Sequence, residues 1–301
     1  MFNVRQRVIG TTNDLFSKEP FPLDTSGQYA GDPGLFGPAS VSWSVLGDAS
    51  VFVGGIRALL VQAAHPEVVA GLMEHSRFLK DPLGRLARTS SYVTATAFGA
   101  MPEVEQAVER VARAHRPVSG ESHRGRRYSA SAEPLAAWVH NALSESFLVC
   151  YQEFGPGALS LVGADRFVAE QAQLGSMLGA APLPRTSAAL SRWVEAVPEL
   201  GPSPGMVEAL AFLRSPPASW PVRFVYRILF ESAVATLPPR VRSLLGLRVR
   251  PASLIVGKAT VRALRVMLGA SPAWRAALDR VGAPIPTGYA FRQPVPTSEI
   301  S

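Results

Sequence analysis

Cysteine, lysine and long apolar runs are scarce or missing in this chain of 301 residues. Cys150 is the single cysteine, so the chain forms no internal disulfide, and we expect a reducing, cytoplasmic environment. No run of about 18 uncharged apolar residues is present, because Asp48 and Arg57 interrupt the best candidate, Val41–His65. The first residues also lack the apolar core of a secretory signal. We therefore expect no transmembrane segment.

Lysine is so rare that arginine carries almost all of the net charge of +7. Nucleic acid is not an expected partner, because the sequence has no zinc-finger spacing, no RNP-like aromatic run and no dense lysine tract. A basic surface can still attract anionic lipid. One group of arginines leaves contact with a membrane surface open as an alternative to ordinary solvation: Arg240, Arg242, Arg248 and Arg250.

Almost every periodic segment has helical spacing, and convincing alternating strands are absent. We therefore predict one all-α domain over residues 41–283, after an N-terminal extension and entry loop over residues 1–40 and before a loosely ordered tail over residues 284–301. The first predicted helix is Val41–Ala64. Proline at the first helical position predicts further helix starts near residues 66, 82, 102 and 134, and other helices follow between residues 165 and 281.

The segment from Pro134 to Phe154 is apolar nearly all round, which is typical of a central, buried helix beside a ligand pocket. Its polar exceptions include Asn141, Ser144 and Glu145. Residues 117–133, before it, are rich in Arg, Ser and Gly, and we interpret them as a polar connection.

His115 is the histidine whose setting suggests chemistry. It follows Val104, Val108 and Val111 at helical spacing, so we expect it on the stripe that faces the core. Burial would favour the neutral imidazole, which is the form that ligates a metal or haem iron. The simpler alternative is a core histidine that hydrogen-bonds a backbone carbonyl.

The preceding helix carries a polar stripe at Arg85, Arg88, Thr89, Tyr92 and Thr96. Two arginines one turn apart beside a hydroxyl suit a carboxylate, a propionate or a bound oxygen species. A solvated face with ordinary surface arginines explains the same spacing.

His140 lies on the apolar segment in line with Phe147, so we expect it to be buried and to need a hydrogen-bond partner. Cys150, on the same segment, is expected to be an inert core residue. Several familiar chemistries are excluded by sequence: there is no His-Glu-x-x-His zinc site, no P-loop and no Gly-x-Ser-x-Gly nucleophile turn.

Several motifs together resemble the catalytic domain shared by rubber oxygenases and the mycophenolate-pathway oxygenase, over roughly residues 30–290. The matching stretches are His65-Pro66, His75-Ser76-x-Phe78, Asp81-Pro82-x-Gly84-Arg85-x-x-Arg88-Thr89, Gly99, Val111-x-x-x-His115-x-x-Val118-x-Gly120, Tyr128-Ser129-Ala130, Trp138-Val139-His140 with Leu143 and Phe147, and Leu183-Pro184. The joint spacing of these elements is far more specific than any one of them. The chain resembles a shorter, intracellular branch of the family.

The resemblance implies an all-α oxygenase that binds haem b and uses dioxygen, with His115 as the iron ligand. It places Arg85, Arg88 and Thr89 on the catalytic distal side, with Arg85 also near the haem, and makes His140 the second choice as ligand or pocket residue. In rubber oxygenases the position of Arg88 is a lysine that can itself ligate the iron. A guanidinium stays protonated and offers no lone pair, so Arg88 is limited to donating hydrogen bonds.

A second departure concerns the glutamate that rubber oxygenases carry before the helix with the Arg-x-x-Lys-Thr step. This sequence has no clear match for that glutamate, and Glu74 is merely nearby. We therefore expect a small apolar, isoprenoid-like or unsaturated substrate rather than a polymer. Two alternatives stay open: a non-catalytic haem-binding or sensor protein, and a haem-free enzyme with His115 and His140 as acid and base. An oligomer is compatible with the sequence.

Overall fold

A computed structural model describes residue 23, residues 25–76 and residues 82–285. Within that part the chain forms thirteen α-helices, one short 3-10 helix and one two-stranded sheet, which confirms the all-α prediction. The elements are η1 (Ser26–Gln28), α2 (Val41–Leu46), α3 (Val51–Ala63), α4 (Pro66–His75), α5 (Pro82–Phe98), α6 (Met101–His115), β1 (Ser119–Glu121), β2 (Arg127–Ser129), α7 (Glu133–Phe154), α8 (Leu161–Met177), α9 (Ser187–Ala196), α10 (Pro204–Arg214), α11 (Trp220–Ala235), α12 (Pro239–Leu244), α13 (Ser253–Leu268) and α14 (Pro272–Val281).

Local sequence explains most helix starts. Four helices begin after a Ser or Thr whose hydroxyl accepts a hydrogen bond from a backbone N–H of the first turn, which satisfies a group that the helix itself leaves unpaired. These caps are Ser40 before α2, Ser160 before α8, Thr186 before α9 and Ser203 before α10. Proline in the first turn opens α4, α6 and α7, as the sequence predicts.

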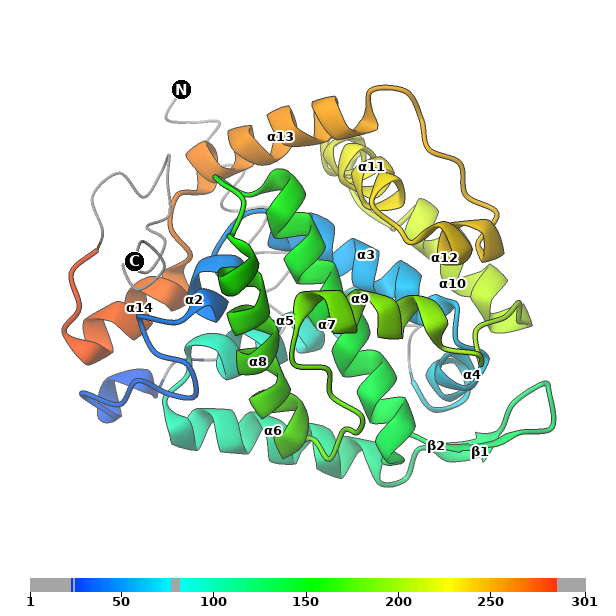
Figure 1. Ribbon diagram of the computed structural model, residues 1–301, viewed down its shortest axis with the longest axis horizontal. Coiled ribbons are helices and arrows are strands. Elements are labelled where there is room, and N and C mark those ends of the chain that lie inside the picture. The colour runs from blue at the N-terminus through cyan, green and yellow to red at the C-terminus, as the bar shows by residue number, and fades with distance from the viewer. Residues whose placement is uncertain (1–22, 24, 77–81, 286–301) are drawn as a thin grey trace.

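Helices α3 and α7 form the centre of the molecule, and α3 passes behind α7 in Figure 1. Their close approach depends on Gly54, because a Cβ at that position would lie 2.7 Å from Cδ1 of Phe147. The two helices also share a buried ion pair between Arg57 and Glu145. The prediction that residues 134–154 form a central, buried helix is confirmed.

The other helices surround this pair. Helices α8 and α9 pack on α7, on the viewer's side in Figure 1, and α2 packs on α8. Helices α4, α10 and α11 pack on α3, and α13 covers α11 along the upper edge. Helices α5 and α6 pack against each other, with α6 along the lower edge.

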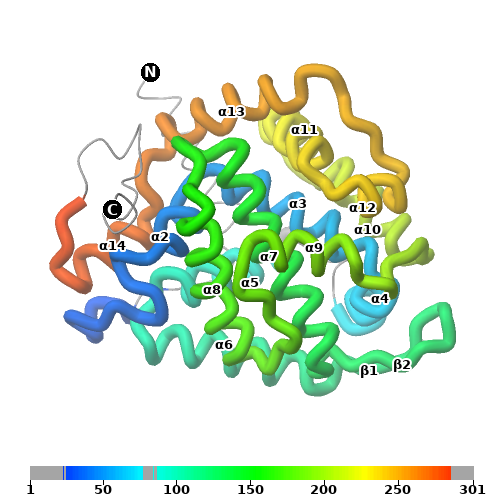
Figure 2. The backbone as a smooth tube through the Cα atoms, viewed as in Figure 1, coloured from blue at the N-terminus to red at the C-terminus, as the bar shows by residue number. Residues whose placement is uncertain are grey.

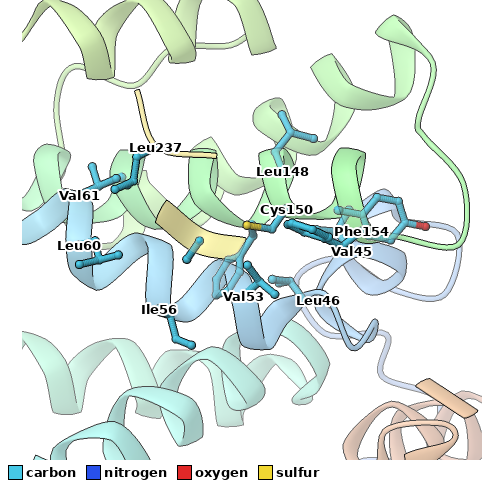
Figure 3. Close-up of a cluster of buried hydrophobic side chains, with 14 of the residues drawn as sticks. Val45, Leu46, Val53, Ile56, Leu60, Val61, Leu148, Cys150, Phe154 and Leu237 are labelled. Carbon is cyan, nitrogen blue, oxygen red and sulfur yellow. The ribbon is translucent and has the colours of Figure 1, made fainter. Parts of the chain in front are cut away.

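The apolar core fills the space between α3, α7 and their neighbours. Figure 3 shows Cys150 of α7 among these side chains, close to Val53 and Phe154. Cys150 is fully buried, and burial raises the pKa of its thiol to about 12, so the side chain stays protonated. The prediction of an inert core cysteine is confirmed.

The prediction of one helix over Val41–Ala64 is wrong in one respect, because the segment breaks between α2 and α3. Asp48 lies in the break and accepts a hydrogen bond from the backbone N–H of Ser50 at 2.8 Å. It also binds the guanidinium of Arg265 on α13, at 2.5 Å and 2.9 Å. This buried carboxylate therefore ends α2 and ties the break to a distant helix.

Residues 117–133 are a structured connection rather than a plain loop. Strands β1 and β2 pair antiparallel with Gly120 opposite Tyr128, and Figure 2 shows the hairpin projecting at the lower right. Gly125 takes a positive φ of 70° in its turn, a conformation that glycine adopts at little cost. The predicted extension and tail lie largely outside the described residues.

Candidate active site

Helices α5 and α6 carry all of the predicted site residues except His140, which lies on α7. Gly99 and Ala100 alone separate the two helices, and the helices pack on each other. Arg85 lies 13 residues before the end of α5, and His115 lies 14 residues after the start of α6. At the helical rise both positions are about 20 Å from the turn. Arg85 and His115 therefore both lie far along their helices from the turn that joins them.

The turn that sets this alignment is built from buried polar contacts. The carboxylate of Glu103 accepts a hydrogen bond from the backbone N–H of Ala100 at 2.8 Å and another from the hydroxyl of Thr25 at 2.8 Å. A Cβ on Gly99 would lie 2.4 Å from the carbonyl oxygen of Ala95, so the helix end is too close for any larger residue. Gly99 therefore lies where α5 ends.

The expectation that His115 faces the core is wrong. Val104 and Val108 are buried and Val111 is half-buried, but His115 is exposed. The helical phase is correct, because residues eleven apart fall on the same face. The last turn of α6 simply extends beyond the core, and its residues from 112 to 116 are all exposed. Burial therefore gives no reason for His115 to be a neutral core imidazole.

The polar stripe of α5 runs from exposed residues in the first half of the helix to buried residues near its C-terminal end. Arg88 and Thr89 are exposed, whereas Thr96 is buried and donates to the backbone carbonyl of Tyr92 at 2.9 Å. The side chain of Arg85 lies outside the described part of the structure. The stripe is therefore neither a wholly solvated face nor a wholly buried one.

Tyr92 is the residue of this stripe whose importance the sequence does not reveal. Its hydroxyl is buried, with no hydrogen-bond partner among the described residues. Burial raises the pKa of this phenol, so it remains a neutral donor. A buried donor without a partner is costly unless a ligand or water satisfies it. Tyr92 lies one helical turn from Arg88 on the same face.

His140 is buried, as predicted, between α7 and α8. Its ring bonds the backbone of Gln171 and lies 3.5 Å from the hydroxyl of Ser144. Burial outweighs the Gln171 bond and lowers the pKa of His140 to about 4. A Cβ on Gly175 would lie 2.9 Å from Nε2, so α8 approaches the ring closely. The packing gives His140 a structural environment rather than an open one.

Glu74 is engaged elsewhere. Its carboxylate accepts a short hydrogen bond from the hydroxyl of Tyr128 on β2, and Glu74 lies near the end of α4. Nε2 of the neighbouring His75 lies 2.9 Å from the carbonyl oxygen of Ser119 on β1. Both side chains therefore hold the hairpin against α4.

A cleft of about 350 Å³ lies between α4, the hairpin, α7 and α9. His65, Trp138 and Trp193 form its aromatic wall. The ring centroids of His65 and Trp138 lie 5.7 Å apart, and those of Trp138 and Trp193 lie 6.0 Å apart. Glu67 beside it is paired with Arg124 at 2.6 Å and accepts from the hydroxyl of Ser122 at 2.9 Å. Burial lowers the pKa of His65 and so favours its neutral form, and its Nδ1 has no hydrogen-bond partner among the described residues.

A larger hollow of about 550 Å³ lies on the opposite side of α9, between α7, α8 and the start of α13. Leu148, Leu161 and Leu254 contribute apolar walls, and Gln152, Glu153 and Thr236 contribute polar groups. Its size is within the range of small-molecule sites. Neither hollow is lined by His115, Arg88 or Thr89.

The residue types on α5 and α6 can be compared with the ligands and hydrogen-bond donors that haem requires. Haem iron needs one axial donor with a lone pair, and an exposed imidazole can supply it without a desolvation cost. Haem propionates need cationic donors, which arginine positions on the adjacent helix can supply. The buried, unpartnered hydroxyl of Tyr92 is a further donor. The residue types therefore fit haem, although the described residues contain no group of three or more His, Cys, Asp or Glu side chains arranged for a bare metal ion.

Comparison with known proteins gives one result. Residues 43–266 match the family described as ER-bound oxygenase mpaB/B'/Rubber oxygenase, catalytic domain. No curated protein and no solved structure matches the chain. Across the described helices, none is long and apolar enough to cross a membrane.

Proposed function

Since the chain belongs to the family of ER-bound mpaB/B' and rubber oxygenase catalytic domains, we propose that it is a haem b-dependent oxygenase that uses dioxygen on a small apolar substrate. The family accounts for oxygenase chemistry. Haem, the iron ligand and the substrate class go beyond that family description, and the motifs around His115 support them.

The observation that carries the proposal is the arrangement of α5 and α6. His115 and Arg85 lie at similar distances along their helices from the turn that joins α5 and α6, and the hydroxyl of Tyr92 on α5 is buried without a hydrogen-bond partner among the described residues. His115 would hold the iron, and Arg85 and Arg88 would bind the propionates. Bound haem would supply the activation of dioxygen.

The protein's own groups have separate tasks in this scheme. Arg88 is exposed and keeps its proton, so it binds anionic oxygens but cannot ligate a metal. Thr89 offers a hydroxyl beside it, and Tyr92 remains a neutral hydrogen-bond donor because burial raises its pKa. These groups can orient a polar end of substrate or cofactor.

A haem-binding protein without turnover is the second candidate. Two observations favour it: Arg88 stands where rubber oxygenases have lysine, and the carboxylate of Glu74 is bound to Tyr128. The haem-free scheme is less well supported, because it needs His140 to reach a substrate and that ring is enclosed between α7 and α8.

The test is an absorbance spectrum with iron analysis of the purified full chain after haem reconstitution. We expect a Soret band and about one iron per chain in the wild type, and loss of both in His115→Ala. His123→Ala is the matched control, because His123 is also exposed and lies on the hairpin. Absence of a Soret band in the wild type, or equal loaded spectra in all three proteins, would refute haem ligation by His115.

Oxygen consumption then separates the two candidates. With reduced, haem-loaded protein and a set of small alkenes, the oxygenase consumes dioxygen and releases cleaved or oxygenated product. A loaded protein that consumes none with any alkene is a haem-binding protein instead.

A further inference from the structure

The charge of the chain is concentrated in one segment. Residues 209–278 contain eleven Lys and Arg but a single acidic residue, Glu231, which gives this basic segment a net charge of +10. The whole chain carries only +7, so the remainder is slightly acidic. Such an asymmetry indicates an anionic partner for one part of the surface rather than a general basic character.

The basic segment also exposes large apolar side chains. Trp220 is 74% exposed and Phe224 is 64% exposed, and they lie one turn apart at the start of α11. Arg223 and Arg227 are exposed as well. At about 100° per residue these four side chains fall within an arc of about 100°. We call Trp220, Arg223, Phe224 and Arg227 the α11 face.

Packing explains why no other described part of the chain covers this face. The buried side of α11 includes Leu229 and Ala233, and α11 packs on α3 and α13. A polar face of ordinary type would carry charged residues alone, whereas here two exposed aromatic side chains lie beside two exposed arginines. Exposed apolar side chains ringed by charge mark an interaction surface.

Helix α13 repeats the pattern on its outer side. Ile255 is 72% exposed and Val266 is 46% exposed. Lys258 and Arg262 are exposed between them on the same side of the helix. Helix α13 forms the upper edge of the molecule in Figure 1 and packs against α11.

We propose that the α11 face, supported by the outer side of α13, docks on the surface of an anionic lipid bilayer. Trp and Phe beside Arg are the residues that an interfacial helix inserts at the level of the lipid headgroups, while the guanidinium groups bind lipid phosphate. Nucleic acid would use the cations but gives less reason for aliphatic side chains such as Ile255 and Val266 on the same segment.

Of the four arginines that the sequence singles out for this role, Arg248 is exposed, and the other three are engaged within the protein. Arg240 donates to the backbone carbonyls of Glu195 and Val197, at 3.0 Å and 2.8 Å. Arg242 donates to the carbonyl of Leu237, and Arg250 pairs with Glu231 at 3.0 Å. These side chains are occupied within the protein, so the contact with lipid falls to the α11 face instead.

The test is sedimentation of the full chain with vesicles of phosphatidylcholine, with and without an equal amount of phosphatidylglycerol. We expect binding to the mixed vesicles alone, weakened by added salt because screening reduces the attraction between arginine and lipid. Trp220→Ser/Phe224→Ser should weaken binding about tenfold or more, and Arg223→Glu/Arg227→Glu by at least as much. All four side chains are exposed, so the variants should keep the wild-type circular dichroism.

Matched controls come from the rest of the surface. Leu161 and Val162 on α8 are 71% and 70% exposed, so Leu161→Ser/Val162→Ser removes two apolar side chains of similar fractional exposure elsewhere. Arg185→Glu/Arg192→Glu changes the net charge as much as the arginine variant does, at exposed sites outside the basic segment. Both controls should bind within about twofold of wild type. Equal losses in variants and controls, equal binding to both vesicles, or binding to double-stranded DNA but not to vesicles would overturn the proposal.

Discussion

Arg57 of α3 donates through both terminal nitrogens to the two carboxylate oxygens of Glu145 of α7, so the two central helices share a buried two-point ion pair. The same guanidinium donates to the hydroxyl of Ser146 at 2.7 Å and to the backbone carbonyl of Thr236 at 3.1 Å. Arg57 is 1% exposed and Glu145 is 4% exposed. A single side chain therefore joins α3, α7 and the end of α11.

Replacing Glu145 by alanine should lower the free energy of unfolding by about 3–5 kcal/mol, because it leaves the guanidinium of Arg57 buried without its counter-charge. Urea denaturation measures the change. Glu109→Ala is the control, because it breaks the Glu109–Arg113 pair, whose side chains are more than half exposed. That control should cost less than about 1 kcal/mol. Similar losses in both variants would mean that the buried pair adds nothing specific.

Adjacent glycines of α3 should respond oppositely to alanine. Gly54→Ala places a Cβ 2.7 Å from Cδ1 and 3.3 Å from Cα of Phe147, so α3 and α7 must separate, at a cost of about 1–3 kcal/mol. Gly55→Ala has nothing within 4 Å of its Cβ and should instead stabilise the helix by about 0.5–1 kcal/mol. Thermal unfolding of the two variants gives the signs directly. A stabilised Gly54→Ala would contradict the close packing.

Stability should depend on the protonation of His140. The pKa of His140 falls from 6.5 to about 4 in the folded protein because of burial, so the unfolded chain binds an additional proton between those pH values. The contribution of the neutral ring to the free energy of unfolding is therefore fully present above about pH 6.5. It is lost as the pH falls toward 4, which lowers the stability by roughly 3 kcal/mol. Denaturant titrations of wild type and His140→Gln across this range measure the difference.

We expect His140→Gln to be less stable than wild type, and its free energy of unfolding should no longer show the decrease between pH 6.5 and 4 that the titration of His140 causes. His123→Gln, at an exposed position of the hairpin, should retain the wild-type slope. If His140→Gln keeps the full slope, the buried ring is not responsible for it.

A lysine at position 88 should change the haem-loaded protein, if the proposed function holds. An amine can lose its proton and offer a lone pair, whereas the guanidinium of Arg88 cannot. We expect Arg88→Lys to show a visible spectrum that changes with alkaline pH, and wild type and Arg88→Gln to show none. Arg88 is exposed, so neither substitution should disturb folding. Identical spectra across the three proteins would place residue 88 away from the iron.

Sequence patterns predicted the helices, the central position of α7 and the family, because periodicity, proline starts and joint motif spacing are local or additive signals. They could not predict partners far apart in the chain. Asp48 and Arg57 were visible only as interruptions of an apolar run, yet each forms a buried ion pair, with Arg265 and Glu145. The error at His115 has the same origin: a helical stripe gives the direction of a side chain but not the point at which neighbouring helices stop covering it.

The close contact of Phe147 with Gly54 limits where a small molecule can lie within the protein. With the ring of Phe147 pressed on the backbone of Gly54, the crossing of α3 and α7 leaves no room for a small molecule between these two helices at that point. Packing constrains the residues of the crossing, so differences in ligand preference fall to residues that lie away from it.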